Sequence, residues 1–262
     1  MSRSLGPPLR QLKISPKTQL FPDDLDMHYW NKANFDGLAR LSEELEVYPN
    51  LRSLASYCRL REKGLRREAM ATLELFLTAA QSFDKATARS SAIQILELNE
   101  RTRETHQFLT QPLISRFLVP TLQAWSEDEP KASVPVRWLG MLFRDSDLLT
   151  KALVMCPEDL PVRKLLIERN ISHAEHATHH LDESYFIGSV EDATVALERA
   201  RNLISNVPDS EQLGCLTSEV NYFDELLADW KAYSEDRAGT FPEWCERRGR
   251  RYGYPIKIYY QR

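Results

Sequence analysis

The sequence is poor in glycine and in cysteine. It has 9 glycines in 262 residues, too few for many hairpin turns or for several phosphate-cradling loops. Leu, Ala, Glu and Arg are frequent instead, and these residues favour helix. The 4 cysteines stand far apart, and no CxxC pair occurs. We therefore expect reduced, mostly buried thiols rather than a metal ribbon.

The sequence also lacks the features of export and of membrane insertion. Its first residues contain no apolar signal-peptide core, and nowhere do about 18 uncharged apolar residues follow one another. These features predict a cytoplasmic protein that does not bind or span a membrane. The formal net charge of -4 is mild, so any attraction to nucleic acid must be local, and nucleic acid is not the partner we expect.

Common catalytic motifs are absent as well. The sequence contains no GxGxxG, no GxxxxGK[ST] and no GxSxG. Runs of carboxylates, as at Glu43, Glu44 and Glu46, are typical of solvated helix surfaces and supply a general acid or base only across a cleft. The sequence therefore favours a non-enzymatic protein, although it leaves the question of an enzyme open.

Helical periodicity is present along most of the chain. Apolar residues three and four positions apart predict helices over 35–48, 50–63, 65–80, 84–104, 111–125, 134–143, 146–155, 161–169, 173–187, 190–207 and 216–230, with a short last helix from 240. Predicted N-terminal caps are Asn50, Asp84, Ser172 and Ser189, and predicted helix stops are Gly64 and Gly188. Pro120 is expected to kink or divide its helix.

This rhythm of helix, tight turn and helix predicts an all-α fold. We expect an array of antiparallel helical hairpins, an α-solenoid of the tetratricopeptide or HEAT kind, with a closed helical bundle as the alternative. Residues 152–159, followed by 162–166, resemble one junction of a tetratricopeptide-type repeat, although no second copy follows at a fixed period. The expected organisation is an extended, proline-containing arm (1–34), the helical array (35–235), and a short helix with a basic, aromatic tail (236–262).

The most unusual segment is rich in histidine. Residues 173–180 hold four of the 6 histidines of the chain. On a helix, His173, His176 and His180 fall within an arc of about 60°, and the spacing of His176 and His180 suits chelation of a divalent ion. Asp182 or Glu183 would supply oxygen ligands. No HExxH order supplies a general base, and the alternative is a polar helix face with solvated histidines.

The C-terminal tail is the second unusual segment. Residues 247–262 contain no acidic residue and interleave cations with aromatic rings. Three interpretations remain open: packing on the helical body, a partner-binding surface, or binding of single-stranded nucleic acid. The candidate contact residues are Arg247, Arg248, Arg250, Arg251, Tyr252, Tyr254, Tyr259 and Tyr260.

Taken together, these features favour a non-enzymatic protein-interaction module, meaning a scaffold, an adaptor or an inhibitor of a partner protein. The alternative is a metal-binding protein or metalloenzyme that uses the His-rich segment 173–180, and a divalent metal is the sole candidate cofactor. A third hypothesis is nucleic-acid binding through 247–262. The sequence does not specify the partner or the oligomeric state.

Overall fold

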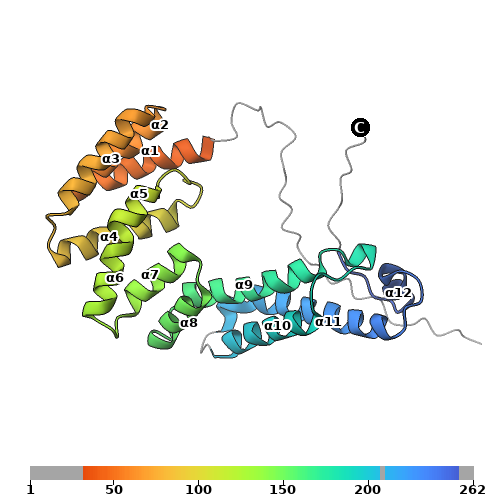
Figure 1. The fold of residues 1–262 in the computed structure, drawn as a ribbon. Coiled ribbons are helices and arrows are strands. Elements are labelled where there is room, and N and C mark those ends of the chain that lie inside the picture. Colours follow the sequence, from red (N-terminus) through yellow and green to blue (C-terminus); the bar gives the residue numbers. More distant parts are fainter. Residues whose placement is uncertain (1–31, 207–209, 254–262) are drawn as a thin grey trace, which may run out of the picture. The chain divides into compact units, whose positions relative to one another are not determined.

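The computed structural model describes residues 32–206 and 210–253, and every regular element in these ranges is a helix (Figure 1). The predicted all-α class is therefore confirmed. Within these ranges, no helix combines the length and the apolar character that a bilayer-spanning segment requires. Contacts divide the chain into two compact units, and the boundary falls between Arg116 and Phe117.

Unit 1 consists of α1 (Lys32–Glu46), η2 (Pro49–Leu51), α2 (Arg52–Glu62), α3 (Arg66–Ala80), α4 (Lys85–Arg101) and α5 (Gln111–Leu113). Helix α2 packs against both α1 and α3. The predicted apolar stripe of α1 is buried, because Leu38, Leu41 and Leu45 are completely shielded from solvent. Leu73 and Phe76 of α3 are equally buried. The core of unit 1 therefore lies along the stripes that the periodicity predicts.

Unit 2 contains α6 (Val119–Asp128), α7 (Ser133–Phe143), α8 (Ser146–Met155), α9 (Leu160–Thr178), η4 (Leu181–Glu183), α10 (Val190–Ser205), η5 (Ser210–Leu213), α11 (Gly214–Glu235) and α12 (Phe241–Arg247). The π-helical segment η3 (Ile114–Leu118) includes the boundary between the units. Pro120 stands in the first turn of α6, directly after η3. The helix is not divided at Pro120 itself; the hydrogen-bonding pattern changes just before it, where the π-helical η3 separates α5 from α6.

The helices α9, α10 and α11 lie side by side and form the core of unit 2 (Figure 1). Small side chains on two of them, Ala174 and Ala177 of α9 and Ala193 of α10, pack with Leu197 and Leu227 in one buried cluster. Because these side chains are small, the two backbones can approach closely. The buried face of α9 is therefore held firmly against its neighbours.

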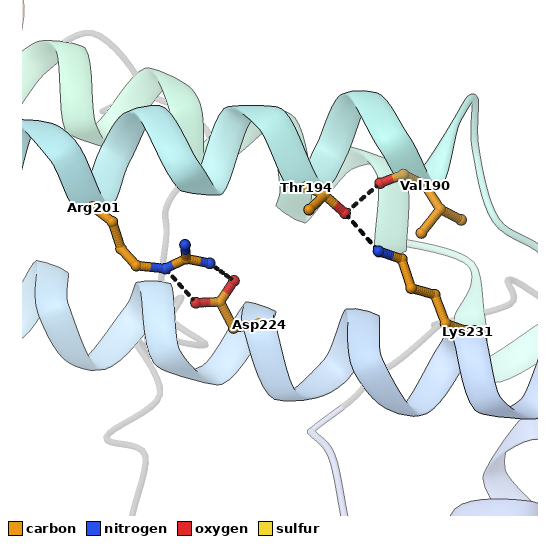
Figure 2. Close-up of polar contacts among 5 residues, drawn as sticks. All are labelled: Val190, Thr194, Arg201, Asp224 and Lys231. Atoms are coloured by element: carbon orange, nitrogen blue, oxygen red, sulfur yellow. Dashed lines mark hydrogen bonds and ion pairs between the residues drawn. The ribbon is translucent and has the colours of Figure 1, made fainter.

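Polar contacts join α10 to α11 outside this apolar core. Figure 2 shows Arg201 facing Asp224, with Nε and Nη2 donating to the two carboxylate oxygens at 2.9 and 2.5 Å. One turn from the other end of α10, Lys231 Nζ donates to Thr194 Oγ1 at 3.2 Å, and that hydroxyl donates to the carbonyl of Val190. The bidentate pair of Arg201 and Asp224 fixes the rotation of α10 against α11.

Several predicted helix boundaries are confirmed by their cap geometry. The Asp84 carboxylate accepts a hydrogen bond from Thr87 N at 2.7 Å, and Ser189 Oγ accepts one from Asp192 N at 3.2 Å. Gly64 follows the end of α2 with φ 74°, the left-handed conformation that glycine adopts without strain. Gly188 also has a positive φ, 76°, but its predicted role as a helix stop is wrong, because α9 ends at Thr178. Local sequence signals are therefore sufficient at the confirmed ends.

Two predicted caps are wrong. Ser172 does not start a helix, because α9 runs without interruption from Leu160 to Thr178. Ile167, before the expected break, and Ile171, within it, are buried in one cluster, and a continuous helix places both on the same face. Asn50 lies inside η2 instead of capping α2. The expectation that the thiols are mostly buried holds for Cys58 and Cys245 only.

Parts of the expected organisation fall outside the described residues. Residues 1–31 of the predicted arm belong to this group, as do residues 254–262 of the predicted tail. Residues 32–34, the last of the predicted arm, form the first turn of α1.

Candidate functional site

His173 and His176 are exposed on the last turns of α9, and His179 and His180 follow the end of the helix. The helix ends at Thr178, whose hydroxyl donates back to the carbonyl of Ala174 at 2.9 Å. The chain then turns back, and Ile187 N donates a hydrogen bond to the carbonyl of Ala177 at 2.8 Å. A shallow depression of about 270 Å³ lies on the exposed side of this helix end, lined by Ser172, Glu175, His176 and His179.

The turn after α9 is attached to the core of unit 2. Leu181 is completely buried in a cluster with Trp230, Phe241 and Trp244 of α11 and α12. Ser184 adopts the left-handed conformation with φ 57°, and its Oγ accepts a hydrogen bond from Phe241 N at 2.7 Å. The turn is therefore attached to the start of α12 by a buried side chain and by a hydrogen bond.

Three rings continue from the depression across this turn. His179 and His180 meet edge to face, with ring centroids 5.1 Å apart, and His180 meets Tyr185 in the same way at 6.5 Å. Tyr185 is 61% exposed. We call this area the His–Tyr surface, defined by Ser172, Glu175, His176, His179 and Tyr185.

The structure brings together a set of possible metal ligands that differs from the predicted one. One ligand atom each of His180, Asp182 and Glu183 lies within 4.8 Å of the other two. Among the described residues this is the one such group of three or more, and His173 and His176 are outside it, exposed on α9. His180 leaves the helical face because α9 ends two residues before it.

The described part of the basic tail folds back onto α11. The Arg250 guanidinium pairs with Glu225 at 3.2 Å and with Asp229 at 3.4 Å. The Tyr252 hydroxyl donates to the Asp229 carboxylate at 2.5 Å. Burial is the main cause that raises the pKa of Tyr252 well above its ordinary value, and the bond to the Asp229 carboxylate raises it further. Asp229 therefore binds both tail residues, Arg250 by an ion pair and Tyr252 by a hydrogen bond.

Aromatic contacts hold the same part of the tail. The Tyr252 ring lies edge to face with Tyr222 at 5.7 Å and stacks on Phe241 at 6.4 Å between centroids. Arg248 covers the ring of Trp244 at 4.0 Å, a cation–π contact. Up to residue 253, these contacts favour the packing interpretation of the tail over the two binding interpretations.

The remaining tail residues are less constrained. Arg247 donates to the carbonyl of Ala238. The Arg251 side chain is 87% exposed, and its guanidinium lies 3.8 Å from the Glu246 carboxylate. Because this contact is long, the charge of Arg251 faces solvent. Three of the predicted contact residues lie outside the described residues: Tyr254, Tyr259 and Tyr260.

Sequence reasoning did not single out Tyr185, Ser172 as a lining residue, or Asp229 as the acceptor for the tail. A usable signal existed for Tyr185, because an aromatic residue between the histidines and Gly188 stands in a turn instead of on an apolar stripe. Asp229 carries no such signal, since it is one of many acids on a helix. Its role depends on a contact 23 residues away along the chain.

Fold and surface together define an all-α protein with an exposed imidazole and tyrosine surface at the end of α9. No family model, no curated protein and no solved structure matches this chain. The functional argument therefore depends on the surface itself.

Proposed function

We propose that this chain is a non-enzymatic protein-interaction module, an array of helical hairpins whose partner protein docks on the His–Tyr surface. The observation that supports it most is a run of rings at the end of α9, in which the exposed Tyr185 contacts His180, and His180 contacts His179, which lines the depression. Tyrosine is enriched among the residues that dominate binding energy at protein interfaces. A depression of about 270 Å³ is large enough for one partner side chain.

Rigidity beneath this surface supports the same proposal. The buried face of α9 packs on α10 and α11, and the turn that carries Tyr185 is fixed by Leu181 and by Ser184. A surface that is ordered before binding loses less conformational entropy when a partner docks. The His–Tyr surface is therefore built on fixed elements instead of on a free loop.

The proposal also specifies that the helices are stacked as an array of hairpins. Neighbouring helices pack against each other in α1–α2, α2–α3, α7–α8, α9–α10 and α10–α11, the pattern expected of stacked hairpins. Such arrays leave the outer faces of their helices available for proteins and peptides. The outer face of α9 is one of these faces.

The tail supports a phosphate-binding function less well. Arg250, which would contact phosphate, is already paired with Glu225 and Asp229. Two carboxylates beside the cation oppose an approaching phosphate. We therefore propose a protein partner, and nucleic-acid binding becomes an outcome of the test.

The experiment uses the intact chain as bait to isolate a partner, followed by measurement of its dissociation constant. The double variant Tyr185→Ala, His179→Ala removes one ring that lines the depression and the exposed ring on the turn after α9. Its matched control is Phe143→Ala, His173→Ala, which removes another exposed aromatic ring of unit 2 and another exposed histidine of α9. A third form ends at residue 253, so that Arg250 and Tyr252 keep their contacts.

We expect the surface variant to weaken binding by about 30-fold or more, as the loss of a hot spot does. The control pair and the shortened form should bind as the intact chain does. If the shortened form alone loses the partner, the tail is the binding site and the proposal is wrong. Binding of nucleic acid that weakens steeply with salt, without a protein partner, would contradict it too.

A further inference from the structure

The turn between α9 and α10 places one imidazole and two carboxylates together. His180 is the first residue after the C-terminal cap of α9, and Asp182 and Glu183 belong to η4. The separation between His180 Nδ1 and Glu183 Oε2 is 3.8 Å. One ligand atom from each of His180, Asp182 and Glu183 lies within 4.8 Å of the other two. Ligands of a bound divalent ion are about 3.0 to 3.6 Å apart, so small side-chain rotations would close this set around an ion.

The backbone holds these three residues in place. Glu183 N and Tyr185 N both donate to the carbonyl of His180, at 3.0 and 3.1 Å. Leu181, between the candidate ligands, points into the core and is completely buried. His180 and Asp182 are half-buried and Glu183 is exposed, so an ion would have a route from solvent. The arrangement is ordered by contacts that do not involve an ion.

The chemistry of the three groups restricts the ion. Imidazole nitrogen with carboxylate oxygen suits Zn²⁺, Fe²⁺, Ni²⁺ or Mn²⁺, whereas Mg²⁺ and Ca²⁺ prefer oxygen ligands throughout. Two carboxylates offset the charge of one divalent ion. Three protein ligands leave at least one coordination position for water or for a ligand from another molecule.

We propose that His180, Asp182 and Glu183 form a site for one divalent transition-metal ion at the end of α9. This site keeps His180 and both of the acidic residues that the sequence offers as alternative oxygen ligands, but it excludes His173 and His176 of the predicted helical set. It does not depend on the protein-interaction function, since binding of the metal is measured without any partner.

The experiment measures Zn²⁺ binding to the intact, tag-free chain after chelator treatment, by titration calorimetry and by metal analysis after dialysis. The variants His180→Ala, Asp182→Asn and Glu183→Gln each remove one proposed ligand. The matched control is the double variant His173→Ala, His176→Ala, which removes two exposed histidines of the same helix. Circular dichroism checks that each variant keeps its helix content.

We expect one Zn²⁺ per chain, and a loss of affinity of at least about tenfold in each of the three ligand variants. The control should bind within about twofold of the unmodified chain. With Co²⁺ as a spectroscopic probe, the visible absorption should change in the three ligand variants and stay the same in the control. These outcomes together would establish the site.

Two results would overturn the proposal. If the control loses binding while Asp182→Asn and Glu183→Gln retain it, the ion binds to the helical face that the sequence predicts. If the unmodified chain takes up no stoichiometric Zn²⁺, Mn²⁺ or Ni²⁺, there is no transition-metal site at this turn.

Discussion

Arg163 brings a positive charge into the core of unit 2. It is only 5% exposed, and its guanidinium donates to the carbonyls of Leu203 at 2.9 Å and Pro157 at 2.6 Å. Leu203 stands in the last turn of α10, where carbonyls have no partner within the helix and carry the negative end of the helix dipole. The buried charge is therefore stabilised by peptide groups at a helix end.

Replacing this arginine tests that interpretation. Arg163→Met keeps much of the apolar stem but removes both hydrogen bonds, and we expect the free energy of unfolding to fall by about 3 kcal/mol. Urea unfolding followed by circular dichroism measures the change. Arg199→Met, on the exposed side of α10, is the control and should stay within about 0.5 kcal/mol. Equal effects of the two replacements would contradict the assigned role.

Tyr57 gives a residue-scale prediction of pH dependence. Its hydroxyl donates to the carbonyl of Gln107 at 2.7 Å, and burial raises the pKa of Tyr57 to about 12. In the unfolded chain the phenol has a pKa of about 10. Because the folded pKa is the higher one, the protonated phenol stabilises the fold fully below pH 10, and this contribution disappears as the pH rises through about 12.

Tyrosinate absorbance during a rising pH titration measures this difference. The unmodified chain should show a late ionisation that Tyr57→Phe lacks, and in urea the two chains should both titrate near the ordinary value of about 10. Tyr252 also titrates late because of its burial and its bond to Asp229, so only the difference between the two chains reports on Tyr57. Identical titrations of the folded chains would show that Tyr57 is accessible to hydroxide.

At the scale of elements, helix α1 depends on one glycine for its contact with the loop after α4. A Cβ added at Gly37 would lie 1.9 Å from Thr105 Oγ1 and 3.2 Å from Thr105 Cβ. The same loop is held to α1 and α2 through Gln107, whose backbone N–H donates to Asn34 and whose carbonyl accepts from Tyr57. Thr105 therefore has little room to move away.

We expect Gly37→Ala to destabilise unit 1 by about 1 to 3 kcal/mol through overpacking, although alanine is the better helix former by about 1 kcal/mol. Thr105→Ala in the same chain should relieve most of this cost. In the described part of the chain the Thr105 hydroxyl has no hydrogen-bond partner, so its removal breaks no bond. A double-mutant cycle from urea unfolding measures the coupling, and strictly additive effects would contradict the close contact.

The ends of elements also show how far sequence reasoning reaches. Asp84 and Ser189 cap helices as predicted, because a cap acts within four residues of its own position. Ser172 has the same chemistry and caps nothing, since Ile167 and Ile171 must both reach the core. The Asn170 side chain bonds to the carbonyl of Leu166 at 2.7 Å, so a polar residue is accommodated inside the helix. Tertiary packing decided this case, and it is not visible in a window of a few residues.

The sequence indicated where an unusual group of side chains lies but not how they are arranged. The four histidines of 173–180 stand on the last turns of α9 and just after its end. The grouping of His176 with His180 assumed that the helix continues to residue 180, whereas it ends at Thr178. Past that point the 100° periodicity no longer applies, and His180 joins Asp182 and Glu183. The predicted helix over 173–187 ends nine residues too late, and this error is sufficient to change which side chains are grouped as possible ligands.

At the scale of the whole molecule, the chain has two compact units, each with its own buried core. Leu73 of α3 and Leu197 of α10 are completely buried, one in each unit. The boundary lies within a helical stretch, so sequence signals for loops do not mark it. A length of 262 residues is compatible with one domain or with two. Stability measurements on the intact chain can therefore show whether the two units unfold independently, which the sequence does not indicate.

Leu73→Ala and Leu197→Ala should each cost about 3 kcal/mol, because each leaves a cavity in a packed core. If each unit unfolds cooperatively by itself, hydrogen exchange of the intact chain should accelerate in 32–116 for Leu73→Ala and in 117–206 and 210–253 for Leu197→Ala. Leu75→Ala on α3, which is 65% exposed, is the control and should change neither region. Acceleration in both regions from one core replacement would mean that the chain unfolds as one cooperative body. In that case a partner or a metal ion bound at the end of α9 would stabilise unit 1 as strongly as unit 2.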